Sequence, residues 1–176
     1  MKLDLDLDEY IPFFLRSIAN RLTQIDRRLY SNQMGIGVNE WSCLALLARE
    51  PNITATRICE VGGYDKSVIS RSIRSLERQG LISTCSAPGH NRKQLLSLTD
   101  RGHSVYATIE KLVLAREKAL LNGITALERR SLIEMLRRIL TNSDCILEQM
   151  QTDDKVQLAY ERVLTGQQKL AIISLD

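Results

Sequence analysis

Residues 65–80 read DKSVISRSIRSLERQG and predict a single amphipathic helix. At about 100° per residue, one face of this helix collects hydroxyl and guanidinium groups, whereas the opposite face is mainly valine, isoleucine and leucine. The polar face consists of Ser67, Ser70, Arg71, Arg74 and Arg78. Serines keep the first half of the helix slim enough for a DNA groove, and arginines farther along can bind guanine edges or phosphates. Taken alone, the same face also fits a solvated helix surface.

The segments on either side of this helix help to decide between those two interpretations. A short helix at about 54–61 ends at two glycines, so that the two helices form a helix-turn-helix. Short strands are expected at 81–85 and 92–98, around a Pro-Gly turn. Arg92 and Lys93 follow this turn, where a winged helix places cations in the adjacent minor groove. The combination favours a winged helix that binds nucleic acid.

Apolar residues recur at helical spacing through most of the remaining sequence. Helices are expected at about 9–32, from Asn39 as N-cap toward Pro51, at 101–121, from the capping box of Thr125 and Glu128 to Met150, and at about 155–164. The predicted fold class is mainly α with a small β-hairpin wing, a winged helix-turn-helix domain flanked by dimerisation helices. The expected divisions are 1–37 for the N-terminal dimerisation helix, 38–100 for the DNA-binding domain, 101–151 for the C-terminal dimerisation helices and 152–176 for a C-terminal extension.

Positive charge is concentrated around the expected helix and wing. Between Tyr64 and Gln94, lysines and arginines outnumber aspartate and glutamate by four, whereas the net charge of the whole chain is +3. The rest of the chain is therefore close to neutral. A compact basic segment in a neutral molecule is typical of a nucleic-acid contact surface.

Several other classes of protein find little support in the sequence. It has no phosphate-cradling glycine loop, nucleophile elbow or short-range pair of catalytic carboxylates, so we expect neither an enzyme nor a cofactor. The four cysteines are widely separated and lack metal-ligand spacing, which indicates reduced thiols, no metal site and a cytoplasmic location. No secretory signal or membrane-spanning segment is evident.

Three motifs, in order, give the chain a family resemblance. They read YDKSVISR at 64–71, LERQGLI at 76–82 and LTDRG at 98–102. With these motifs, the chain from about 10 to 150 resembles the MarR family of winged-helix transcription regulators. The resemblance implies a homodimer that binds a pseudo-palindromic double-stranded DNA operator, usually as a repressor released by a small ligand or an oxidant.

The resemblance also assigns DNA contacts by position. They fall on Lys66, Ser67, Ser70, Arg71 and Arg74 of the recognition helix and on Arg92 of the wing. The residue pattern itself adds Arg78 and Lys93. The family usually has Asp-x-Arg in the wing, where this chain has His90-Asn91-Arg92, and Thr84 stands where an arginine is usual. We therefore expect less internal charge pairing in this wing.

Long apolar stripes on the first helix and on the two helices after the wing indicate a second copy of the chain. The winged-helix segment between them has only about 60 residues and is too small to cover all of these stripes. A twofold axis would place two recognition helices about one DNA turn apart. The alternative is an intramolecular bundle that caps the domain.

The family resemblance implies a ligand cleft between the dimer helices and the DNA-binding lobe. Arg16, near Phe13 on the first helix, and Trp41 on the second helix are candidates for binding an aromatic carboxylate. The alternative is that Phe13 and Trp41 belong to the core and that Arg16 forms a surface ion pair.

Thiol-based redox control is the alternative mode of regulation. Cys85, at the start of the wing and near cationic residues, is the candidate sensor, whereas Cys43, Cys59 and Cys145 are expected to be buried. A protein-interaction module without DNA binding is a further alternative. The serine-arginine face of the predicted recognition helix argues against that module.

Overall fold

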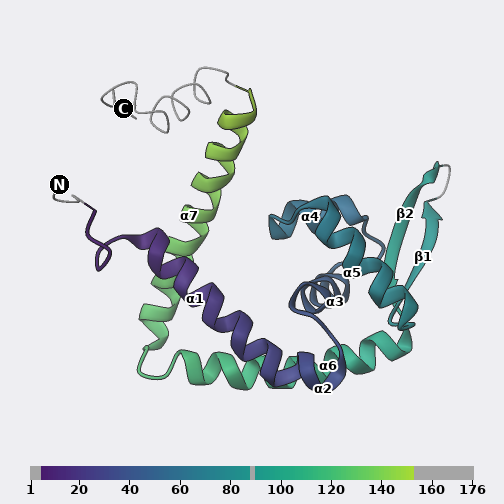
Figure 1. The fold of residues 1–176 in the computed structure, drawn as a ribbon, viewed down its shortest axis with the longest axis horizontal. Coiled ribbons are helices and arrows are strands. Elements are labelled where there is room, and N and C mark those ends of the chain that lie inside the picture. Colours follow the sequence, from purple (N-terminus) through teal and green to yellow (C-terminus); the bar gives the residue numbers. More distant parts are fainter. Residues whose placement is uncertain (1–4, 88–89, 153–176) are drawn as a thin grey trace. The chain divides into compact units, whose positions relative to one another are not determined.

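The computed structural model of the protein describes residues 5–87 and 90–152, and its chain divides into two compact units (Figure 1). The first unit ends at Leu120 and the second begins at Leu121. The first unit contains the winged helix-turn-helix, and the second contains one long helix. The predicted fold class, mainly α with a β-hairpin wing, is confirmed.

The expected first helix is one rod with an irregular turn. It consists of α1 (Ile11–Asp26), a π-helical turn η1 (Arg27–Ser31) and a short α2 (Asn32–Met34). Gly35 then takes a left-handed conformation with φ 67° and ends the helix. Asp26 and Tyr30 are buried at this turn, and Asp26 pairs with Arg116 of α6 (Asp100–Leu120). An ion pair thus joins the first helix to the last helix of the same unit.

The helices of the helix-turn-helix lie close to where the sequence predicts them. They are α3 (Val38–Arg49), α4 (Ala55–Gly62) and α5 (Lys66–Arg78). The N-cap of α3 is Gly37 and not Asn39, because the Glu40 carboxylate accepts a hydrogen bond from the Gly37 N–H. Asp65 is the N-cap of α5, although its side chain makes no capping hydrogen bond.

Strands β1 (Ile82–Ala87) and β2 (His90–Leu98) form an antiparallel hairpin, each extending two residues farther toward the turn than predicted. Ile82 pairs with Leu98 and Thr84 pairs with Leu96. The α3–α4 loop adds an isolated bridge between Ile53 and Leu96, in which the Leu96 N–H donates to the Ile53 carbonyl at 2.8 Å. The base of the hairpin is therefore tied to the helical part of the domain.

The apolar core of the first unit extends from η1 to α6. On α5, Ile69 and Leu76 have no exposed surface and Ser72 is nearly covered, so the predicted apolar face of this helix points inward. The other buried apolar residues are Tyr30, Ile36, Cys43, Leu44, Leu47, Ile58, Leu81, Ile82, Leu96 and Ile109. This packing fixes the rotation of α5 about its own axis.

The apolar stripes outside the winged helix remain exposed. Phe13 and Phe14 on α1 are 45% and 44% exposed, so the interpretation of Phe13 as a core residue is wrong for the single chain. In the second unit, the predicted capping box opens α7 (Ala126–Thr152): the Thr125 N–H donates to Glu128 Oε2 at 2.8 Å. The apolar residues of α7 that stay exposed are Leu127, Met135, Leu136, Ile139, Leu140, Ile146 and Leu147.

Two further expectations concern α7 and the segment after it. Cys145 is exposed, which corrects the prediction that it is buried; it lies one turn after Thr141, on the side of α7 away from most of its apolar residues. The helix expected at about 155–164 falls outside the described residues. Among the helices that the structure describes, none has the length and apolar content to cross a membrane.

The Asp26–Arg116 pair gives a test of how the first helix is held. Both side chains are mostly covered, with 8% and 22% of their surface exposed. Removing Asp26 leaves the Arg116 charge without its partner in a poorly hydrated site. Asp26→Ala should therefore lower the free energy of unfolding by about 3 kcal/mol, measured by urea titration at fixed protein concentration. The double variant Asp26→Ala/Arg116→Met should be more stable than Asp26→Ala alone. A double variant that is less stable would contradict this account.

Candidate nucleic-acid interface

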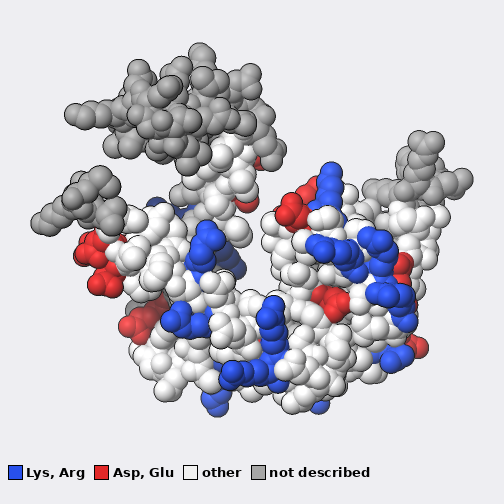
Figure 2. Space-filling view, viewed as in Figure 1, with Lys and Arg blue, Asp and Glu red and all other residues white. Residues whose placement is uncertain are grey.

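The polar face of α5 is fully presented to solvent. Lys66 and all five residues predicted for this face, Ser67, Ser70, Arg71, Arg74 and Arg78, are exposed. Figure 2 shows the resulting group of basic side chains over the region of α5. The burial of Ile69 and Leu76 on the other side leaves this face no alternative orientation.

The three arginines of α5 are ordered along the helix by contacts with its own backbone. The Nε atom of Arg71 donates to the Ser67 carbonyl, that of Arg74 to the Ser70 carbonyl and that of Arg78 to the Arg74 carbonyl, at 3.2–3.3 Å. Because Arg71 and Arg78 use only Nε in these bonds, their terminal nitrogens can take part in further contacts. The arrangement gives a row of guanidinium groups one turn apart.

The hairpin lies beside this row, across a narrow groove. A cavity of about 230 Å³ separates the two elements and is lined by Ala55, Ser70, Ile73, Arg74, Glu77, Thr84, Gln94 and Leu96. The Thr84 hydroxyl donates to the Glu77 carboxylate across one side of it. The backbone places Arg92 and Lys93 on β2, but their side chains lie outside the described residues.

A second cavity of about 300 Å³ lies between α3 and α4. It is lined by Trp41, Ser42, Ala45, Leu46, Arg49, Ile58, Val61, Gly62 and Tyr64. The Trp41 ring stacks on Tyr106 of α6 with ring centroids 5.4 Å apart, and the Tyr64 hydroxyl donates to Ser42 Oγ at 3.0 Å. Of the three residues predicted to bind a ligand, the structure places Trp41 at this cavity. Arg16 and Phe13 are exposed on α1 and do not line it.

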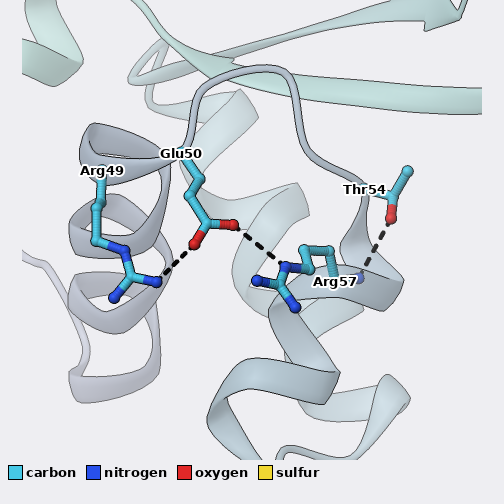
Figure 3. A network of polar contacts seen from close by, with 4 residues as sticks. All are labelled: Arg49, Glu50, Thr54 and Arg57. Atoms are coloured by element: carbon cyan, nitrogen blue, oxygen red, sulfur yellow. Dashed lines mark hydrogen bonds and ion pairs between the residues drawn. The ribbon is translucent and has the colours of Figure 1, made fainter.

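The guanidinium at this cavity belongs to Arg49, which the sequence analysis did not single out. The signal for it was available: Trp41, Ala45 and Arg49 are spaced by four, so they share one face of α3. The Arg49 Nη2 atom lies 2.6 Å from Glu50 Oε1, and Glu50 Oε2 lies 3.2 Å from Arg57 Nε (Figure 3). Hydrogen bonds from these two arginines lower the pKa of Glu50. Arg49, which lines the cavity, thus holds the carboxylate of its neighbour Glu50.

The cysteines differ in their surroundings. Cys43 is buried, and this burial, with smaller contributions from Glu40 and Cys59, raises the pKa of its thiol to about 12. Cys59 is partly buried, and Cys85 is exposed on β1, opposite Leu95. In the part of the chain that the structure describes, no cluster of histidine, cysteine, aspartate or glutamate could hold a metal ion.

Comparisons with known proteins agree with this architecture. Residues 34–93 match the MarR family. An uncharacterized HTH-type transcriptional regulator of Bacillus subtilis, YdgJ, is 30% identical over 108 residues, which cover 61% of this chain and 66% of that protein. The aligned stretch thus spans slightly less than two thirds of that relative's length.

Two solved structures share the fold over nearly their full length. A MarR/EmrR family regulator from Acinetobacter sp. ADP1 superimposes with a TM-score of 0.74 and 24% identity, covering 80% of this chain and 99% of that one. The PcaV transcriptional regulator of Streptomyces coelicolor, in complex with its natural ligand, gives a TM-score of 0.72 and 22% identity, covering 81% and 99%.

Proposed function

Because the chain belongs to the MarR family of winged-helix transcription regulators, which are not enzymes, we propose that it binds a pseudo-palindromic DNA operator through α5 and the wing. The observation that carries this proposal is the exposed row of Ser67, Ser70, Arg71, Arg74 and Arg78 on a helix whose other face is buried. A role on DNA places the action of the protein in the cytoplasm.

The chemistry of the row suits a major groove. From the start of α5 to Ser70, the exposed side chains are Lys66 and the small hydroxyl residues Ser67 and Ser70, so the helix backbone can come close to the base edges. Arg71 and Arg74 follow, one and two turns in, at a distance where they can reach guanine O6 and N7 or the flanking phosphates. Arg78 lies near the end of the helix, where a phosphate contact is the simpler assignment. Arg92 and Lys93 complete the interface from the wing.

Two copies of the chain are needed for a palindromic site, and the uncovered apolar stripes supply the means of pairing. Phe13, Phe14 and Ile18 on α1 and the exposed apolar residues of α7 form surfaces of the kind that a second subunit buries. The resulting homodimer carries one recognition helix for each half-site. We assign it the role of a repressor.

Release from DNA would follow the binding of a small aromatic carboxylate. The cavity between α3 and α4 offers the Trp41 ring, the hydroxyl groups of Ser42 and Tyr64, and the Arg49 guanidinium. An apolar wall with a few polar groups and one cation is suited to an aromatic acid. The ligand would act by binding more tightly to an arrangement of the recognition helices that does not fit the operator. Arg16, exposed on α1, is the alternative anchor for the carboxylate.

Arginine substitutions on α5 test the DNA interface. Arg71→Ala and Arg74→Ala should each weaken binding to the DNA upstream of the protein's own gene by about tenfold, and each phosphate contact removed should reduce the slope of log affinity against log salt by about 1. Gel shifts at several salt concentrations measure both quantities. Lys111→Ala, an exposed cation on α6, should bind as the wild type does. An interaction module without DNA contact would show no wild-type binding even at low salt.

Sedimentation equilibrium tests the dimer. The wild-type protein should sediment at twice the chain mass at micromolar concentration. Leu136→Glu, in the exposed apolar stripe of α7, should shift the protein toward monomers because it buries a charge in the interface. Thr141→Glu, an exposed position on the opposite side of α7, is the matched control and should remain dimeric. A well-folded wild-type monomer would refute the pairing.

Ligand-response variants test the cavity. We expect benzoate or a hydroxybenzoate to release the wild-type protein from DNA, and Trp41→Ala and Arg49→Ala to require at least about tenfold more of it, since each removes one anchoring contact. Arg57→Ala is the control, because Arg57 pairs with Glu50 without lining the cavity. A normal response in Arg49→Ala together with a lost response in Arg16→Ala would move the anchor to the first helix.

A further inference from the structure

Glu77 is the one carboxylate within α5, and it stands among cations. It is exposed, and it lines the groove between α5 and the hairpin together with Arg74. A negative charge at this position opposes the phosphates of a DNA duplex bound along the helix. Its charge therefore does not assist DNA binding directly, and its contacts indicate another purpose.

The contact of Glu77 is with the wing. The Thr84 hydroxyl of β1 donates to Glu77 Oε1. Thr84 pairs with Leu96, and Leu96 is in turn bridged to Ile53 in the α3–α4 loop. At the Thr84–Leu96 pair, therefore, the backbone of the α3–α4 loop contacts β2, and the Glu77 side chain of α5 contacts β1.

This pair of ties lies where the hairpin leaves the body of the domain. At the base of the hairpin, two hydrogen bonds of Thr99 connect the end of β2 to the start of β1. The Thr99 hydroxyl donates to the Gly80 carbonyl at 2.8 Å, and the Thr99 N–H donates to the Leu81 carbonyl at 3.0 Å. Beside the pair of ties, the cavity of about 230 Å³ shows that the hairpin is not packed flush against α5. The Glu77–Thr84 hydrogen bond bridges this gap.

A small tilt of the hairpin at Thr84 produces a large displacement at the far end of β1. Three residues separate Thr84 from Ala87, a span of about 10 Å along the strand, so a tilt of about 15° displaces the end of β1 by about 3 Å. That displacement is as long as a hydrogen bond. A two-stranded hairpin has little stiffness of its own, so its inclination depends on such ties.

We propose that Glu77 is a positioning residue that fixes the inclination of the wing to α5 through Thr84, and so sets where Arg92 and Lys93 meet the DNA beside the recognition site. The proposal rests on the proposed DNA-binding function. In this chain the carboxylate of α5 takes the Thr84 hydroxyl of β1 as its partner.

Two duplexes separate wing contacts from recognition-helix contacts. The first is a 40-base-pair duplex selected by the wild-type protein from a random-sequence library, and the second is the same duplex trimmed to its two major-groove half-sites. Glu77→Ala and Thr84→Val should each bind the full duplex about tenfold more weakly, whereas their affinity for the trimmed duplex should be no lower than that of the wild type. The double variant should lose no more than either single variant, because both remove the same contact.

Conservative variants distinguish positioning from general stability. Glu77→Gln and Thr84→Ser keep an acceptor and a donor, and both should restore binding to the full duplex to within about twofold of the wild type. Glu60→Ala, which removes an exposed carboxylate from α4, is the control for charge alone and should not weaken binding. Hydroxyl-radical footprints of Glu77→Ala should lose the flanking minor-groove protection and keep the central protection.

The proposal is overturned if Glu77→Ala binds the full duplex as the wild type does, or if its loss is equal on both duplexes, or if the losses of Glu77→Ala and Thr84→Val add in the double variant. Failure of Glu77→Gln to restore binding while its thermal unfolding stays normal would also overturn it. A wild-type protein that selects no duplex would instead refute the proposed function from which the inference starts.

Discussion

The burial of one face of α5 is the constraint on which the interface depends. Ile69 and Leu76 have no exposed surface, and covering each of them contributes about 2 kcal/mol. Turning the helix by half a turn would expose both and would push three guanidinium groups into an apolar core, at a far larger cost. The serine-arginine face is therefore held outward by the same packing that stabilises the domain. The face proposed to bind DNA and the face that packs into the core therefore belong to one helix.

The position of the hairpin also depends on α5. It starts directly after α5, its base is bound by Thr99 and the Ile53–Leu96 bridge, and one side chain of α5 reaches back to hold it. Helix and wing thus form one surface with a groove between them. The apolar stripes of α1 and α7 lie outside this surface and remain uncovered in the single chain. Among the described residues, the winged helix covers its own apolar core, whereas the helices proposed to pair with a second copy keep exposed apolar residues.

Much of this fold follows from local patterns in the sequence. The periodicity around Ile69 and Leu76 and the Thr125–Glu128 capping box predict helices that the structure contains. What escaped prediction depends on long-range packing. Nothing local indicates that Asp26 pairs with Arg116 ninety residues away, or that Glu77 reaches Thr84 across a turn. Arg49 could have been found from its spacing to Trp41, but the cavity between α3 and α4 exists only once both helices are packed. Cys145 was misplaced because its helical position was not weighed: it lies one turn after Thr141, on the side of α7 away from most of the exposed apolar residues.

Protection of guanine N7 from dimethyl sulfate tests the central claim most directly, because this atom lies in the major groove, where α5 is proposed to bind. On the duplex that the wild-type protein selects, the account predicts two clusters of protected guanines, centred about 10 base pairs apart and on one face of the DNA. Protection that is absent from the major groove, or spread evenly along the duplex, would contradict the claim that the exposed serine-arginine face of α5 binds there.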